Sequence, residues 1–177
     1  MKKENLIKTT LAAICLSLGI VLPFLTMQIK EIGDSLLPMH FAALLCGVLC
    51  GKWYGLSVGF LIPITRSLLF SMPPMYPNAM YMAFEIATYG AVMGLLYKKD
   101  RKMPFWYIWV CLIIAQISGR IIWGLGKAIL LGVGQSGFTF TAFIIGGFVD
   151  ALPGIITQLI LIPVLIKALQ KSNFIKV

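Results

Sequence analysis

Six ionisable side chains stand inside long apolar stretches of this sequence. They are His40, Arg66, Glu85, Arg120, Lys127 and Asp150. A charge near the centre of a lipid bilayer costs between about 3 and more than 10 kcal/mol, depending on the scale. We therefore expect these residues to pair with each other, to face a cavity, or to bind a ligand.

The balance of these charges favours an acidic ligand. Three of the six residues are cations at neutral pH and two are carboxylates, which leaves one spare positive charge when the histidine is neutral. The guanidinium groups of Arg66 and Arg120 match the geometry of a planar carboxylate. The sequence therefore predicts that one or both arginines bind an acid group of a substrate.

Structural roles are the alternative for each of these residues. The two carboxylates can form internal ion pairs with the two arginines. Lys127 can extend its ammonium group to the membrane surface, and His40 can be a hydrogen-bonded structural residue.

Neutral polar and aromatic residues occur near the same positions: Tyr76, Asn78, Tyr81, Trp123 and Gln158. Aromatic residues at a membrane boundary are often anchors, so Tyr76 and Trp123 are the first aromatic candidates and Tyr81 the next. The predicted substrate-binding residues are His40, Arg66, Tyr76, Asn78, Glu85, Arg120, Trp123 and Asp150.

The elements that must position these residues follow from composition. The chain has 177 residues, of which 59% are hydrophobic and only 12% charged, whereas about a quarter are charged in soluble domains. The apolar runs of the sequence are long and continuous, which favours helices over the alternating strands of a membrane barrel. We predict an all-α membrane protein, a six transmembrane helix bundle, forming one domain over residues 1–177. The expected helices are roughly 7–28, 36–51, 53–71, 78–97, 105–131 and 140–168.

The basic residues predict the topology. With six crossings, all of the lysine and arginine clusters fall on one side, together with both chain ends, whereas the other side receives Lys30, Glu31 and Asp34. The N and C termini are therefore expected to be cytoplasmic. Counted at 1.5 Å per residue from the helix ends, the six ionisable residues then all fall in the outer half of the bilayer. A polar set confined to one half predicts a pocket open to one side.

Several other classes of protein are disfavoured. The sequence has no Walker A motif and no paired His-Glu metal motif, so we expect no enzyme activity, no cofactor and no metal. The net charge of +9 reflects membrane topology, and no nucleic acid is expected as a partner. A self-sufficient small-solute transporter or channel remains an alternative, but it needs polar groups in the inner half or an inverted repeat.

Three stretches together resemble a known family: "LLPMHFAALLCGVLCG" (36–51), "GFLIPITRSLLFSMPPMYPNAMYMAFEIATYGAVMGLLYK" (59–98) and "DALPGIITQLILIPVLI" (150–166). They are similar to the substrate-binding S components of energy-coupling factor (ECF) vitamin transporters, which are ABC-type importers. The resemblance implies a multi-pass protein of the bacterial plasma membrane. It also implies tight binding of a water-soluble vitamin near the outer surface, followed by toppling of the whole subunit in the membrane.

The same resemblance implies partners and a substrate. Members associate with a transmembrane T component and two ATPase subunits, and they use an Ala-xxx-Ala pattern on the first helix to meet the T component. Here Ala13 and Ser17 are the nearest match. The Pro-Met-His and Met-Pro-Pro-x-Tyr-Pro stretches are most similar to members assigned to pantothenate, pyridoxine-type compounds or hydroxymethylpyrimidine. The spare cation favours pantothenate, which carries a carboxylate.

Overall fold

The computed structural model describes residues 2–26, 37–97, 104–132 and 138–171, and these form six helical segments. The all-α prediction is therefore confirmed for the described residues. Five runs are long and apolar enough to cross a membrane, whereas α3 has only 13 residues, fewer than the roughly 20 that a full crossing needs. The elements are α1 (Lys2–Val21), η1 (Leu22–Thr26), α3 (Pro38–Cys50), α4 (Lys52–Phe70), η2 (Met75–Ala79), α5 (Met80–Leu96), α6 (Trp106–Leu131), α7 (Phe140–Ile144), η3 (Ile145–Val149) and α8 (Leu152–Lys171).

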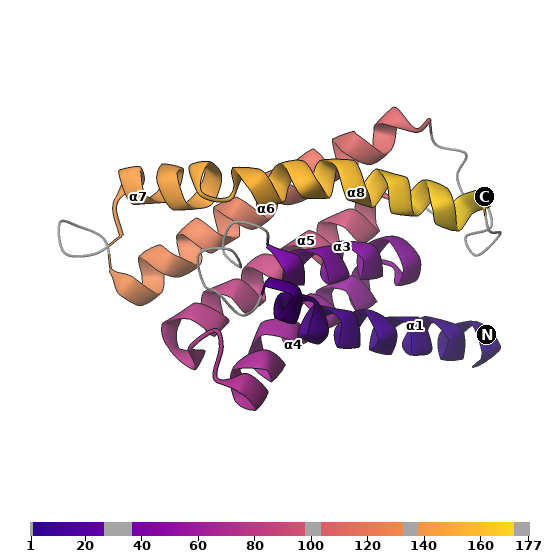
Figure 1. The fold of residues 1–177 in the computed structure, drawn as a ribbon, viewed down its shortest axis with the longest axis horizontal. Helices are drawn as coiled ribbons and strands as arrows, with labels where there is room; N and C mark the ends of the chain where they lie inside the picture. The colour runs from indigo at the N-terminus through magenta and orange to yellow at the C-terminus, as the bar shows by residue number, and fades with distance from the viewer. Residues whose placement is uncertain (1, 27–36, 98–103, 133–137, 172–177) are drawn as a thin grey trace.

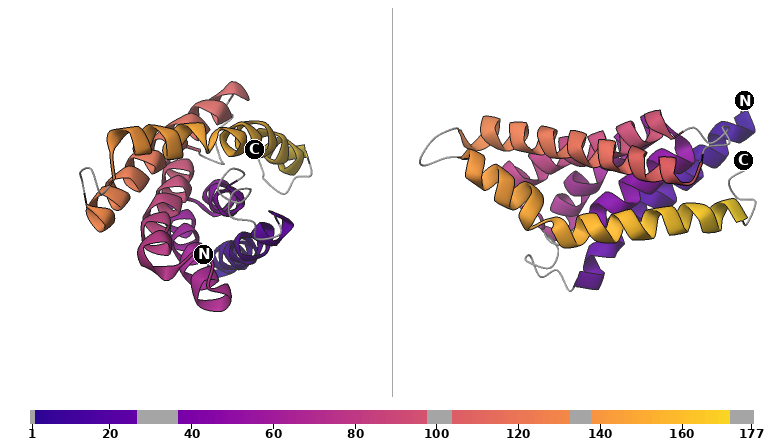
Figure 2. Two further views of the ribbon diagram at one scale, coloured as in Figure 1. Left: turned by 60° about the vertical axis from the view of Figure 1, so that its left-hand side comes forward. Right: turned by 90° about the horizontal axis from the view of Figure 1, so that it is seen from above.

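The helices run roughly lengthwise, and α6 and α8 lie on the opposite side of the bundle from α1 and α4 (Figure 1). The start of α1 and the end of α8 lie at the same end of the molecule, which we call the terminal end. Helix α3 lies in the interior (Figure 2) and contacts α1, α4, α5 and α8. This explains why nine residues of the short α3 are buried.

Close packing of α5 against α4 depends on glycine. A Cβ atom on Gly55 would overlap the backbone carbonyl of Gly90, and one on Gly90 would overlap Gly55 in turn. Small residues at such positions let helix backbones approach closely in lipid. The contact fixes the rotation of α5 about its axis, so that a different face of α5 is directed to α6.

The turn between α3 and α4 is a single residue, Gly51. Its φ of 91° lies in a region that side chains other than hydrogen rarely adopt. Because the turn is so short, α3 and α4 are held side by side and antiparallel.

The core near the terminal end is almost wholly apolar. Leu44, Val48, Met93 and Leu112 are buried there. A partly buried polar contact joins Tyr97 to Gln170, whose Nε2 donates to the tyrosine hydroxyl at 3.0 Å. The buried ionisable residues of the described chain lie farther from this end. The two halves of the bundle therefore differ in chemistry.

Candidate functional site

The carboxylate of Glu85 is the centre of a buried polar cluster. Its Oε1 lies 3.0 Å from Nη1 of Arg120 and 3.3 Å from Nε2 of His40, and it accepts a hydrogen bond from the Tyr89 hydroxyl at 3.4 Å. The side chains of Glu85, Arg120 and His40 are at most 3% exposed. We call these four residues, which come from α3, α5 and α6, the Glu85 cluster.

Helix periodicity explains how α5 and α6 build this cluster. Glu85 and Tyr89 are four residues apart, so they share one face of α5. Arg120 lies opposite Glu85, and Gly119 leaves room for the Tyr89 ring, which a Cβ atom at position 119 would meet at 2.7 Å. His40 completes the cluster from α3, with its ring edge-on to Tyr89 at a centroid distance of 4.9 Å.

Several nitrogen atoms of the cluster have no hydrogen-bond partner within the described part of the chain. Both Nε and Nη2 of Arg120 are buried and unpartnered, and so are the two ring nitrogens of His40 by hydrogen-bond geometry. The N–H groups on Nε and Nη2 point in parallel along one edge of the guanidinium, the arrangement that binds two oxygens at once. The carboxylate of Glu85 contacts only Nη1, so this edge of Arg120 has no partner among the described residues.

An aromatic group adjoins the cluster at the end away from the termini. The Trp123 ring is 7% exposed, and its centroid is 5.9 Å from the Arg120 guanidinium carbon and 4.4 Å from the Lys127 nitrogen. The same Lys127 nitrogen is 5.4 Å from the Tyr81 ring and 5.6 Å from the Phe138 ring. Two cations therefore lie against one indole.

A pair of amides adjoins the cluster on its other side. Nε2 of Gln116 donates to Oε1 of Gln158 at 3.1 Å, joining α6 to α8. Both side chains are buried, and Nε2 of Gln158 has no partner in the described residues. Gln116 lies one turn before Arg120 on α6, so the amides and the guanidinium share a helix face.

The structure brings together half of the predicted site residues: His40, Glu85, Arg120 and Trp123. Asn78 lies nearby, since its Oδ1 accepts a hydrogen bond from Tyr81 at 3.0 Å. Tyr76 is 63% exposed, and its hydroxyl donates to the carbonyl of Leu130 at 3.1 Å. The substrate-binding roles of these residues stay predictions.

Arg66 and Asp150 lie apart from the Glu85 cluster. Nη1 of Arg66 donates to the carbonyl of Ile20 at 2.5 Å, and its guanidinium carbon is 5.3 Å and 5.5 Å from the rings of Phe24 and Phe70. Asp150 is exposed and forms no ion pair with any residue that the structure describes. Neither residue is placed to complete the cluster in this arrangement.

Sequence reasoning overlooked Tyr89 and Gln116, and it gave Gln158 only a minor place. A usable signal was present on α6, where Gln116, Arg120, Trp123 and Lys127 recur at the spacing of one helix face. Neutral polar residues inside apolar helices attract less notice than charged ones, although they are also costly to bury unpaired.

The face predicted to meet a partner lies on α1. Ala13 and Ser17 are both exposed, and the Ser17 hydroxyl donates to the carbonyl of Ala13 at 3.0 Å. Ala12 and Cys15, on the opposite face of the same helix, are buried in a core shared with α3. The partner-binding role of Ala13 and Ser17 stays a prediction.

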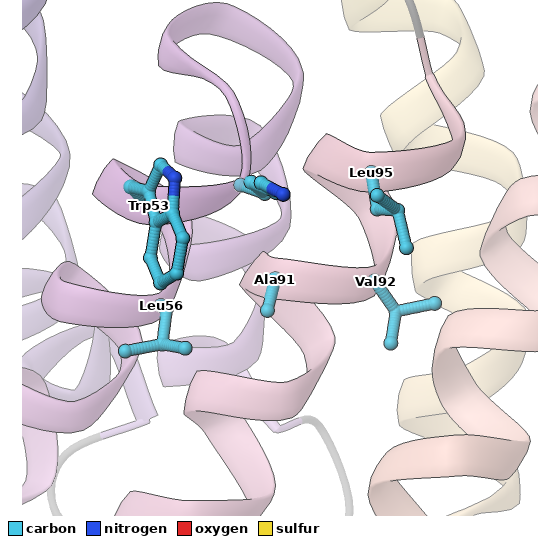
Figure 3. Close-up of a pocket in the computed structure, with 6 residues that line it drawn as sticks. Trp53, Leu56, Ala91, Val92 and Leu95 are labelled. Atoms are coloured by element: carbon cyan, nitrogen blue, oxygen red, sulfur yellow. The ribbon is translucent and has the colours of Figure 1, made fainter.

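A separate hollow of about 230 Å³ lies between α4 and α5 near the terminal end (Figure 3). Its lining is apolar except for one lysine, and it includes Trp53, Leu56 and Leu95. Leu95 is ten residues beyond Glu85 on α5, or about 15 Å along the helix. This hollow is therefore distinct from the Glu85 cluster.

Comparison with known proteins identifies the family. The family model described as the ECF transporter substrate-specific component matches residues 8–166. No curated protein and no solved structure gives a significant match. The match covers most of the chain and agrees with its apolar helices, which are those of a multi-pass membrane protein. The chain therefore belongs to the substrate-specific components of ECF transporters, a family of transporter subunits and not of enzymes.

Proposed function

We propose that this subunit binds a water-soluble vitamin or related micronutrient carrying a carboxylate, with pantothenate as the first candidate. The substrate acid group lies on the unused edge of Arg120, and Trp123 covers it from the side. His40 and Tyr89 hold Glu85 in place, and Glu85 orients the guanidinium. Pyridoxine-type compounds and hydroxymethylpyrimidine, which carry no carboxylate, are the alternatives in which the substrate is not an acid.

The observation that carries this proposal is the buried, unpartnered edge of Arg120. A buried N–H without an acceptor costs about 1–3 kcal/mol, and more for a charged group. A carboxylate on Nε and Nη2 would satisfy two such donors with charge-assisted hydrogen bonds. Within the cluster, Glu85 is the sole carboxylate, and it already contacts Arg120 through Nη1. An acidic ligand therefore suits the site better than a basic one.

The position of the cluster supports a pocket open to one side. Arg120 is eleven residues from Leu131, the end of α6 away from the termini, or about 17 Å along the helix. Polar and aromatic residues continue from Arg120 towards that end, whereas beyond the Gln116–Gln158 pair the core of the described residues towards the terminal end is almost wholly apolar. This favours a binding pocket in the outer half of the membrane over a conducting path, with both termini cytoplasmic.

Delivery of the substrate is proposed to follow the mode of the family. The subunit associates with a transmembrane T component and two ATPase subunits in the bacterial plasma membrane. The exposed face of α1 carrying Ala13 and Ser17 is the proposed contact with the T component. Small side chains there would let a partner helix approach closely.

The test compares pantothenate with pantothenol, the alcohol in which the carboxylate is replaced. We expect calorimetric titration of the purified protein in detergent to show that pantothenate binds at least about 100-fold more tightly, as two charge-assisted hydrogen bonds predict. The variant Arg120→Ala should lose this preference. Equal affinities of the wild-type protein for the two compounds would refute recognition of an acid group.

A matched control separates recognition from folding. The double variant Glu85→Gln with Arg120→Met removes both members of the ion pair, so it leaves no unpaired charge. We expect it to bind pantothenol about as well as the wild type does, without preferring pantothenate. Wild-type binding of pyridoxine or hydroxymethylpyrimidine in place of pantothenate would also refute recognition of an acid group, because neither compound carries a carboxylate.

A further inference from the structure

We infer that the amide pair Gln116–Gln158 is a second, uncharged recognition point of the same site. It binds a neutral oxygen acceptor of the substrate, a carbonyl or a hydroxyl, about one helical turn inward from the acid-binding edge of Arg120. The inference rests on the proposed function and deepens it. Together, the two recognition points define the substrate as a compound with an acid group at one end and an uncharged hydrogen-bonding group a short distance away.

The placement of the two amides carries the first step. Gln116 and Arg120 are four residues apart on α6, which puts their Cβ atoms about 5–6 Å apart on one face. Gln158 reaches the same place from α8 and is 1% exposed, while Gln116 is 6% exposed. A small ligand lying on the unused edge of Arg120 therefore lies within one helical turn of both amides.

Hydrogen-bond accounting supplies the second step. The bond from Gln116 Nε2 to Gln158 Oε1 couples the orientations of the two amides, because flipping either one alone would bring two like groups together. Nε2 of Gln158 is then left as a buried donor with no partner in the described segments. Buried polar groups in native structures are nearly always satisfied by protein or water, so an acceptor from the ligand is the natural partner.

A purely structural role would leave this donor unexplained. Interhelical amide bonds do join membrane helices, and Gln170 forms such a bond from α8 to Tyr97 of α5. Gln170 is only partly buried, whereas Nε2 of Gln158 is a fully buried atom without a partner among the described residues. The unpartnered donor belongs to an amide bonded to Gln116, which lies one helical turn from Arg120 on α6. Two neighbouring sets of unpartnered donors favour a ligand-binding role over a purely structural bond between helices.

The experiment compares Gln158→Leu with Gln170→Leu. Both variants remove a glutamine of α8 that bonds to another helix, but Gln170 is twelve residues away, or about 18 Å along the helix. Calorimetric titrations use pantothenate, pyridoxine and hydroxymethylpyrimidine. We expect Gln158→Leu to weaken whichever of these the wild type binds by at least about tenfold, and Gln170→Leu to change that affinity by less than about twofold.

The same titrations distinguish failure of the inference from failure of the proposed function. Because Arg120 is intact in Gln158→Leu, this variant should weaken pantothenate and pantothenol by the same factor and keep the preference between them. Unchanged affinity in Gln158→Leu overturns the inference alone. Wild-type protein that binds none of the three compounds overturns the proposed substrates and this inference with them.

A conservative variant covers the case in which Gln158→Leu does not fold. Gln158→Asn keeps the amide but withdraws it by one methylene, so it should fold and weaken binding by a few-fold, with Gln170→Asn as its control. If the amide pair only joins the helices, the two asparagine variants should instead lower the melting temperature of the ligand-free protein to the same extent and leave all affinities unchanged. That result would also overturn the inference.

Discussion

Two arginines of this protein are equally buried, at 3% exposure each, but their surroundings differ. Arg120 lies between α5 and α6, faces the Glu85 carboxylate and keeps one edge unused. Arg66 lies beside the end of α1, donates through Nη1 to the Ile20 carbonyl and is flanked by two phenylalanine rings, so that only its Nε is buried and unpartnered in the described residues. A cation at the C-terminal end of a helix is favourable by itself. Burial of a charge therefore does not identify a ligand site, whereas its partners do.

The largest effect on stability is expected for Arg120→Ala. This change leaves Glu85 buried without its guanidinium partner, and breaking a buried ion pair in this way costs about 3–5 kcal/mol of the free energy of unfolding. Denaturant titration in detergent measures the loss. The double variant Glu85→Gln with Arg120→Met should regain most of this lost free energy of unfolding. If Arg120→Ala alone were as stable as the wild type, the pair would not be buried as described.

A smaller effect, of a different kind, is expected for Arg66→Met. Loss of the hydrogen bond to Ile20 and of the contacts with Phe24 and Phe70 should lower the free energy of unfolding by about 1–3 kcal/mol. The preference for pantothenate over pantothenol should remain, because Arg120 is untouched. Loss of that preference would place Arg66 in the substrate site, as its position in the sequence suggested, and would remove the contrast between the two arginines.

The smallest effect is expected for Lys127→Met, which tests how far the site extends from Arg120. The ammonium group contacts Trp123 at 4.4 Å, and its loss should cost about 0.5–2 kcal/mol of stability. Affinity for pantothenate should fall a few-fold as a nearby positive charge is removed. Lys52→Met is the matched control, because Lys52 lies 5.0 Å from the Trp53 ring at the terminal end. Equal effects of the two variants on affinity would exclude Lys127 from the site.

Much of the fold was predictable because it depends on local properties. The lengths of the apolar runs predict helices near α4, α5 and α6, and Gly51 and the prolines near residues 73–77 predict the turns beside them. The candidate site was predictable in part: Glu85, Arg120 and His40 were identified from the cost of burying them. The missed residues, Tyr89 and Gln116, are uncharged, and their importance follows from their neighbours.

The sequence by itself determined that this is a helical membrane protein with costly polar residues in the half away from its termini. Hydrophobicity and charge act residue by residue, so both conclusions can be read without knowing which helices meet. Only the tertiary structure decided that Glu85 pairs with Arg120 and that Arg66 binds the end of α1. Such pairings depend on the rotation of each helix, which for α5 is set by backbone contact at Gly55 and Gly90. That contact joins residues distant in the chain, so no local pattern contains it.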